Sequence, residues 1–281
     1  MSPWSHRELR VIVSPDQVAL WPVRRTLGLR GLRRTIDDEP HIVSCNSASG
    51  ALPWRAALQA LETSLPRYAN GKPAATVILS NHLLRYALVP WRAELADAEE
   101  DLSFARHCFG KVYGKAAQQW ELRLSQEAPE MPRLASAVDT ELLAGLRAVF
   151  DGAGIALRSI QPHLMAAFNG FRSRRQQPSA WFALLEPGNL CLALLQQGRW
   201  SRVRSLRIDR AWRVELPLIL EREAVLADDP AVPHEVYVWS AESGDTALPE
   251  IDPWHFHALG PGLVPGAMAV QGRPLATARA G

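Results

Sequence analysis

The amino-acid sequence predicts an α/β protein built from two similar blocks, and two observations support this fold class. Near the N-terminus, two short β-like runs, Leu9–Ser14 and Gln17–Val23, precede a helical pattern and a further strand. In the second half of the chain, three strand-like runs again precede a helix and a strand. This repeated order indicates two lobes that share one topology.

The first block is completed by a third strand, a helix and a fourth strand. The turn Pro15-Asp16 joins the first two strands, and Arg24–Glu39 is interpreted as a loop because it is rich in Arg, Gly and Asp. His41–Cys45 is the expected third strand. A helix begins near Pro53, and Ala74–Ser80 has the apolar run of a buried strand. The helix carries apolar residues at helical spacing, namely Trp54, Ala57, Leu58, Leu61 and Leu65.

The middle of the chain has a different order of elements, which predicts a small subdomain inserted between the lobes. His82–Val89 is an expected strand, and Asp97–Gln119 has the pattern of a capped amphipathic helix. Trp120–Ser125 and Leu134–Val138 are the next strands, and a second helix is expected to begin after Asp139.

A strand at Ile155–Ile160 and a helix at Pro162–Phe171 lead into the second block. The elements expected there are strands at Ala180–Leu185, Cys191–Leu195 and Ser201–Ile208, a helix at Val214–Ala227 and a strand at Glu235–Ser240. The predicted division is a first lobe over 1–80, the insert and its return over 81–160, and a second lobe over 161–281.

The composition is that of a folded protein, with 47% hydrophobic and 21% charged residues and a net charge of +2. All but three of the 31 basic residues are arginines. We interpret the arginine clusters as solvated surface, with contact to anionic lipid or an acidic partner as the alternative. No stacking aromatic residues are interleaved with them in a nucleic-acid-binding pattern, so no nucleic-acid partner is expected.

Features of cysteine use and hydropathy predict a cytoplasmic protein. Cys45, Cys108 and Cys191 are odd in number and form no C-x-x-C pair, as is typical of reduced thiols. The chain begins without the apolar stretch of a signal peptide. No run approaches the ~20 apolar residues that a membrane helix needs.

Several stretches resemble one known family in their order and hydrophobic pattern over residues 8–240. They are Val77–Ser80 followed by Tyr86–Pro90, Leu142–Gly154 followed by Leu157–Ala167, and Trp181–Arg207. The family is that of the pseudo-actin proteins of type IV pili and type II secretion: PilM, MshI and the cytoplasmic part of GspL. The resemblance implies two ribonuclease H-like lobes, the actin/Hsp70-type ATPase fold, with a small inserted α+β subdomain.

The turns that would grip phosphate depart from the pattern of nucleotide-binding members. Those members open each lobe with an Asp-x-Gly type turn, whose glycine lets backbone amides approach phosphate. Here the first turn places Asp16 after Pro15, which has no N–H, and no glycine follows. The second turn keeps Glu186 and Gly188 but has no Ser or Thr downstream. We interpret Asp16, Glu186 and Gly188 as degenerate phosphate-turn positions and expect no cofactor and no ATP hydrolysis.

Other catalytic or metal motifs are absent from the sequence. It contains no phosphate-binding loop of the G-x-x-x-x-G-K-[ST] type. His255 and His257 could begin a zinc site, but no residue at ligand spacing completes it. Asn81-His82 is interpreted as hydrogen bonding within a turn, because no nucleophile motif accompanies it. No catalytic and no metal-binding residue is therefore expected.

The resemblance also implies a function. PilM-like proteins hold the short cytoplasmic N-terminal segment of a PilN-like inner-membrane protein in a groove that involves the inserted subdomain. By resemblance, the chain is expected to be a non-catalytic scaffold, peripheral to the inner membrane through such a partner. His82–Trp91 and Asp97–Gln119 should border the groove, with Arg85, Tyr86 and Trp91 as candidate contacts. An ATP-binding actin-like switch of the same machinery is the alternative, and a carbohydrate- or acyl-modifying enzyme has no supporting motif.

Overall fold

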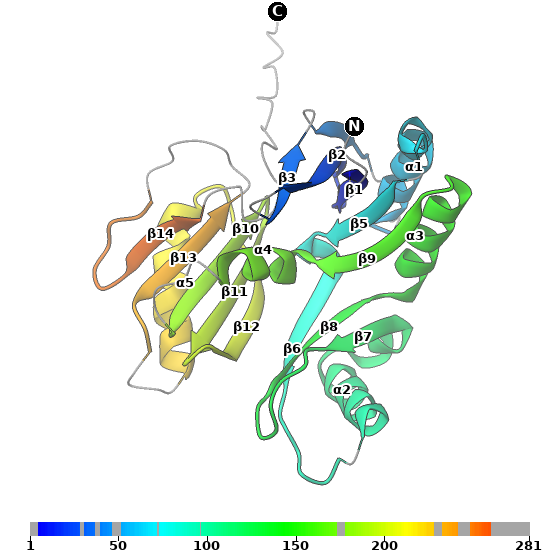
Figure 1. The fold of residues 1–281 in the computed structure, drawn as a ribbon. Helices are drawn as coiled ribbons and strands as arrows, with labels where there is room; N and C mark the ends of the chain where they lie inside the picture. The colour runs from blue at the N-terminus through cyan, green and yellow to red at the C-terminus, as the bar shows by residue number, and fades with distance from the viewer. Residues whose placement is uncertain are drawn as a thin grey trace, which may run out of the picture.

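The computed structural model describes residues 5–28, 31–36, 40–46, 52–71, 73–95, 97–172, 178–227, 232–240 and 248–259. These residues form three β-sheets with helices packed against them (Figure 1). Two of the sheets belong to the two lobes, and the third belongs to the insert.

The first sheet has the strand order β3-β2-β1-β5-β9, and β4 also pairs with β2. Its strands are β1 (Ser5–Val13), β2 (Gln17–Gly28), β3 (Gly31–Ile36), β4 (His41–Ser44), β5 (Ala74–Leu79) and β9 (Ala156–Pro162). β1 runs antiparallel to β2 and parallel to β5, and β5 runs parallel to β9. Leu9, Val11 and Val13 alternate along β1 and are buried in the core.

Two helices, α1 (Arg55–Ser64) and α3 (Thr140–Gly152), cover one face of this sheet (Figure 1). They contribute Leu61 and Leu146 to the core. Gly145 permits their close approach, because a Cβ at this position would lie 2.4 Å from Cδ1 of Leu58.

The second sheet repeats the first, with the order β12-β11-β10-β13-β14. Its strands are β10 (Ala180–Glu186), β11 (Asn189–Gln196), β12 (Arg199–Arg207), β13 (Glu235–Ser240) and β14 (His255–Leu259). The first three are antiparallel, and β10, β13 and β14 are parallel. The prediction of two lobes with one topology is confirmed. Helix α5 (Trp212–Ala227) packs on one face through Trp212, Leu216 and Leu220.

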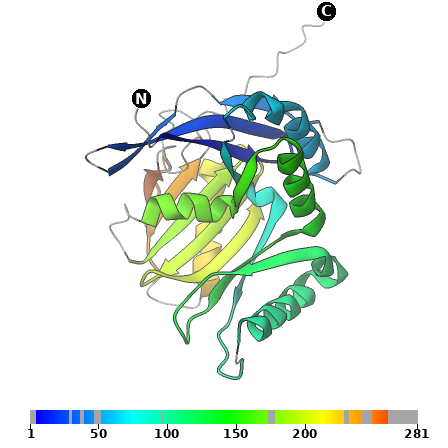
Figure 2. The same cartoon turned by 45° about the vertical axis from the view of Figure 1, so that its right-hand side comes forward.

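Helix α4 (His163–Arg172) lies across the other face of the second sheet (Figure 2). Phe171 stacks on Phe182 with ring centroids 5.3 Å apart and also contacts Tyr237 at 4.6 Å. The α4 residues belong to the same hydrophobic cluster as the buried residues of the first sheet. The two lobes therefore share one continuous core.

The insert is a three-stranded sheet with its own small core. Its order is β6-β8-β7, formed by β6 (Leu84–Val89), β8 (Arg133–Asp139) and β7 (Trp120–Leu124). Helix α2 (Ala98–Tyr113) packs on one face through Ala105 and Phe109. The helix predicted over Asp97–Gln119 ends earlier, because Gly114 has a φ of 62° and a 3₁₀-helix follows.

The predicted loop over Arg24–Glu39 is wrong. β2 continues to Gly28 and pairs with β3 in an antiparallel hairpin, while β4 pairs with the beginning of β2. A hairpin held by backbone hydrogen bonds needs no alternation of apolar residues, and that alternation was the signal missing from this segment.

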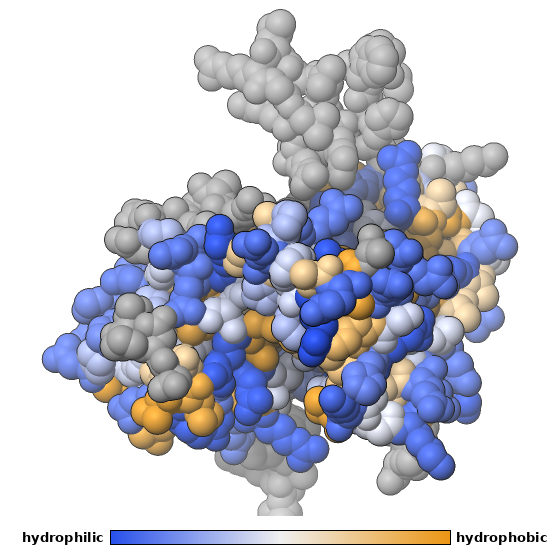
Figure 3. All heavy atoms as spheres, turned by 90° about the horizontal axis from the view of Figure 1, so that it is seen from below, coloured by the Kyte–Doolittle hydropathy of each residue, from blue (hydrophilic) through white to orange (hydrophobic). Residues whose placement is uncertain are grey.

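One face of the molecule is mostly polar (Figure 3). Seen from below, hydrophilic residues cover most of the face and apolar residues form separate patches (Figure 3). Among the described helices, none combines the length and hydropathy needed to cross a bilayer.

Candidate functional site

Polar residues follow the parallel strands of the first sheet where these strands end. Ser14, Ser80 and His163 come directly after β1, β5 and β9, and Glu186 is the last residue of β10. In α/β folds, ligands bind at the carboxyl ends of parallel strands. The topology thus places these residues where this fold would hold a ligand.

The Glu186 carboxylate is bonded to the first lobe and to the helix between the lobes. Its Oε2 accepts a hydrogen bond from the backbone N–H of Asn81 at 2.9 Å, and its Oε1 lies 2.9 Å from Nδ1 of His163. An ionised carboxylate can only accept, so His163 donates this bond. The hydroxyl of the buried Ser80 helps to lower the pKa of Glu186. We call Ser80, Asn81, Tyr86, His163 and Glu186 the interlobe cluster.

Asn81 is the central residue of this cluster. Its Oδ1 accepts hydrogen bonds from the Tyr86 hydroxyl at 2.7 Å and from the backbone N–H of Leu164 at 3.3 Å. These two bonds join β6 to the beginning of α4. Asn81 is 1% exposed, so its polar atoms depend on protein partners. The predicted bonding within the Asn81-His82 turn is therefore only part of its role.

Two neighbouring contacts fix the orientation of the cluster. The ring of Trp239 packs edge-on against the ring of His163, with centroids 4.6 Å apart. Nε2 of His82 lies 2.9 Å from the carbonyl oxygen of Pro187, in the turn between β10 and β11. The second-lobe turn is thus attached to the first lobe at two consecutive residues, Glu186 and Pro187.

The surroundings of Glu186 favour its ionised form. Burial alone would raise the pKa of this carboxyl, but the charge of His163 and hydrogen bonds from His163 and Ser80 lower the pKa below its usual value. Burial raises the pKa of Tyr86, and the nearby Cys191 and Glu186 raise it further. The cluster therefore holds a charged acceptor among buried hydrogen-bond donors.

Asp16 and Gly188, the other two degenerate phosphate-turn positions, are not part of the interlobe cluster. Asp16 is exposed, and its backbone carbonyl accepts a hydrogen bond from Cys45. The first turn is closed by Ser14, whose hydroxyl donates to the Gln17 carbonyl at 3.0 Å. Gly188 is exposed at φ 75° and makes the tight turn after Glu186. Of the three positions, the Glu186 side chain is the one bonded within the interlobe cluster.

The three candidate partner contacts lie in different surroundings. Tyr86 is 8% exposed and bonded within the interlobe cluster. Arg85 is exposed, and its guanidinium donates to the backbone carbonyls of Leu84 and His82. Trp91 is 37% exposed in the segment after β6. Their role as partner contacts stays a prediction.

A groove of about 370 Å³ lies between the insert sheet and strand β9. We call it the β9 groove. Its apolar lining is Leu79, Leu84, Val138, Leu143, Leu157 and Ile160. Its polar lining is Glu121, Arg123, Ser136, Arg147, Arg158 and Ser159, with Pro162 at the end of β9. None of Arg85, Tyr86 and Trp91 lines this groove.

The β9 groove has an open strand edge and excess positive charge. Among the described strands, β9 pairs with β5 alone, and a register shift leaves Arg158 as an extra residue. Arg123 and Arg147 share Glu121, with nitrogen–oxygen distances of 2.9 and 3.6 Å. Arg158 is exposed and also lines the groove, so the lining contains three arginines and one carboxylate.

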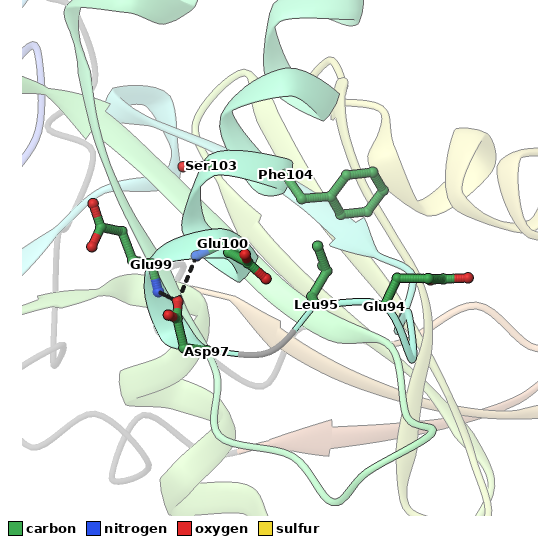
Figure 4. Close-up of a pocket in the computed structure, with 7 residues that line it drawn as sticks. All are labelled: Glu94, Leu95, Asp97, Glu99, Glu100, Ser103 and Phe104. Carbon is green, nitrogen blue, oxygen red and sulfur yellow. Dashed lines mark hydrogen bonds between the residues drawn. The ribbon is translucent and has the colours of Figure 1, made fainter.

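A second cavity, at the beginning of α2, is explained by helix capping. It measures about 640 Å³ and is lined by several carboxylates (Figure 4). Oδ1 of Asp97 accepts hydrogen bonds from the N–H groups of Glu99 and Glu100 at 2.8 and 2.9 Å. Acidic residues in the first turn also interact favourably with the helix dipole. The acidic cavity therefore needs no ligand to account for it.

One carboxylate on the neighbouring strand contacts both histidines of β14. Glu235 of β13 contacts Nδ1 of His255 at 3.0 Å and Nε2 of His257 at 2.5 Å. The hydrogen bond from His257 lowers the pKa of Glu235, against a smaller opposing effect of burial. No group of three or more metal-ligating side chains is arranged to hold an ion in the described part of the chain.

Sequence reasoning missed several residues of these sites. His163 follows Pro162 at the beginning of a helix, and this position after a strand is the signal that could have identified it. Arg123, Arg147 and Arg158 come from β7, α3 and β9. Their sequence spacing carries no signal, because the fold alone brings them together.

Comparison with known proteins identifies the fold. No family model and no curated protein sequence matches the chain. The cytoplasmic domain of EpsL, an inner-membrane component of the type II secretion system of Vibrio cholerae, matches with a TM-score of 0.56 and 11% identity, over 91% of this chain and 90% of that chain. The structure of the PilM-PilN type IV pilus biogenesis complex matches with a TM-score of 0.55 and 17% identity, over 83% and 80%.

A third structure supports the same conclusion. A Bacteroides thetaiotaomicron protein of unknown function with an actin-like ATPase fold matches with a TM-score of 0.53 and 9% identity, over 83% of this chain and 81% of that chain. Likeness at this level of identity shows the fold and not the activity. The chain has the two-lobed actin-like fold of these proteins, which confirms the fold class predicted from its sequence.

Proposed function

We propose that this chain is a non-catalytic scaffold of a pilus- or secretion-type machine, and that its β9 groove binds a short segment of a PilN-like inner-membrane partner. The observation that carries the proposal is the groove beside the edge of β9 that pairs with no other described strand. In the proposal the chain is cytoplasmic and reaches the membrane through this partner.

The geometry of the β9 groove suits an extended peptide. The free edge of β9 offers backbone N–H and C=O groups to which a segment can add as a further strand. Apolar side chains such as Leu143 and Ile160 provide pockets for alternate residues of the segment. The similar fold of PilM, solved in complex with PilN, supports a partner of this kind.

The interlobe cluster supports a role without ATP hydrolysis. The carboxylate of Glu186 takes up the hydrogen bonds of Asn81 and His163 at the carboxyl ends of the first-lobe strands. A nucleotide phosphate at these donors would meet a buried negative charge.

Peptide binding tests the proposal. The probe is a fluorescent synthetic peptide with the cytoplasmic N-terminal sequence of a PilN-like single-span membrane protein, titrated in fluorescence anisotropy. We expect saturable binding that Arg158→Glu weakens at least tenfold, or about 1.4 kcal/mol. Arg106→Glu is the matched control, because Arg106 is exposed on α2, on the other face of the insert sheet. Equal affinity of Arg158→Glu and Arg106→Glu for the peptide would mean that it binds outside the β9 groove. A third variant, Trp91→Ala, tests the partner contact predicted from sequence.

The alternative, an ATP-binding switch, is tested by thermal unfolding with Mg·ATP. A ligand at a hundredfold excess over its Kd stabilises a protein by about 2.7 kcal/mol. We expect no magnesium-dependent shift at millimolar ATP. A clear shift would favour the switch over the scaffold.

A further inference from the structure

The interlobe cluster holds one carboxylate with the donors that a protein offers to a bound anion. A backbone N–H from Asn81 and a ring N–H from His163 donate to it, and the hydroxyl of Ser80 is a third group, which helps to lower the pKa of the carboxyl. Their residues are 1%, 3% and 0% exposed. Hydrogen bonds from buried donors to a charged acceptor are the strong kind.

Two further nitrogen atoms of the cluster have no hydrogen-bond partner among the residues that the structure describes. They are Nδ2 of Asn81 and Nε2 of His163, both buried. The amide orientation of Asn81 is fixed, because its Oδ1 accepts from Tyr86 and Leu164. Nδ2 is therefore a donor left over after Glu186 is bound. The cluster thus offers more hydrogen bonds than one carboxylate uses.

Glu186 reaches these donors from the other lobe. It ends β10, whose backbone pairs with β11 and β13 of the second sheet. Asn81 lies between β5 and β6, and His163 begins α4 directly after β9. The bonds of one carboxylate therefore connect the second lobe to the first.

We propose that Ser80, Asn81 and His163 form an anion-binding site whose resident ligand is the Glu186 carboxylate. The ligand class of this site is a small oxyanion, either a carboxylate or a phosphate. The second lobe is then fastened to the first by a ligand that belongs to the chain itself. This inference does not depend on the proposed partner, because the site lies within one chain.

Removing the resident ligand tests the site. In Glu186→Ala, the donors lose their acceptor and the melting temperature falls. We expect sodium formate, sodium acetate or inorganic phosphate to raise the Tm of this variant by about 2–4 °C, with saturation. Sodium chloride at the same ionic strength gives no such rise, and wild type gains nothing because Glu186 occupies the site. Formate acting without phosphate would define a carboxylate site, and phosphate acting as well would define a general oxyanion site.

Two further variants keep the test decisive. Glu235→Ala removes a carboxylate that also contacts two histidines, but Glu235 lies at an accessible edge with a side chain 30% exposed. We expect no anion-specific recovery in it. Glu186→Gln keeps the shape of the side chain and folds if Glu186→Ala does not. It should melt below wild type and show no recovery, because the amide fills the site.

Two results would overturn the proposal. One is an equal anion response in Glu186→Ala and Glu235→Ala. The other, where Glu186→Ala does not fold, is a melting temperature for Glu186→Gln that equals wild type. Hydrogen exchange gives a second readout, in which the amides of Asn81–Leu83 exchange faster in Glu186→Ala and formate reverses the change.

Discussion

At the residue scale, Tyr86 shows how a residue chosen from sequence as a partner contact also has a structural role. Its hydroxyl donates to Oδ1 of Asn81 at 2.7 Å inside the core. Tyr86→Phe keeps the ring and removes this bond, so we expect the free energy of unfolding to fall by about 1 kcal/mol. Urea unfolding followed by tryptophan fluorescence measures the change.

Tyr113→Phe is the matched control for this change. Tyr113 packs its ring on Trp120 at 5.1 Å, in the separate core of the insert. We expect its variant to stay within about 0.5 kcal/mol of wild type. If both variants lost the same stability, the Tyr86–Asn81 bond would contribute nothing specific.

The lowered pKa of Glu186 predicts how stability depends on pH. Its usual value is 4.5, and the folded value lies below it. The stabilisation from the ionised carboxylate is therefore fully present above about pH 4.5 to 5 and is lost as pH falls through the folded pKa. We expect the stability advantage of wild type over Glu186→Gln to shrink below pH 4.5, with a slope of at most about 1.4 kcal/mol per pH unit. Urea unfolding at a series of pH values checks this, and a constant difference down to acid unfolding would contradict it.

At the scale of elements, the N-cap of α2 gives a separate prediction for the insert. Asp97 is exposed, and its carboxylate accepts hydrogen bonds from two N–H groups of the first turn. Asp97→Ala should reduce the stability of α2 by about 1 kcal/mol. Hydrogen exchange should show faster exchange in α2 with α3 unchanged. The reciprocal control is Asp139→Ala, which removes the corresponding cap of α3, with bonds of 2.8 and 3.4 Å. If the amides of α2 in Asp97→Ala exchanged at the wild-type rate, the prediction would be contradicted.

The elements that the sequence predicted correctly are those that contribute many apolar residues to the core. Alternating or continuous apolar runs located β1, β5 and β10, and helical spacing located α1 and α3. β3 was missed because the hairpin lacks apolar alternation in its sequence: in the backbone register Arg25 pairs with Arg34, and Thr26 pairs with Arg33. β14 was not predicted as a strand, because its exposed residues include His255 and His257.

At the scale of the whole molecule, the candidate sites depend on contacts between distant segments. Glu186 was singled out from sequence because it sits in a turn at the start of the second lobe. Its partners Asn81 and His163 lie 105 and 23 residues away. Only the arrangement of both lobes brings these residues together. The β9 groove has the same origin, since it forms between the insert and the edge of the first sheet.

The shared core predicts that the two lobes unfold as one unit. Buried residues of β5 such as Val77 and of β10 such as Phe182 belong to one hydrophobic cluster, joined by Phe171 of α4. The insert has a cluster of its own, which contains Phe109 and Leu122. In native-state hydrogen exchange we expect the amides of β5 and β10 to exchange with the same opening free energy, and those of β7 and α2 with a lower one. If β10 exchanged at a lower free energy than β5, the second lobe would open alone, and α4 would then be a linker rather than the centre of a common core.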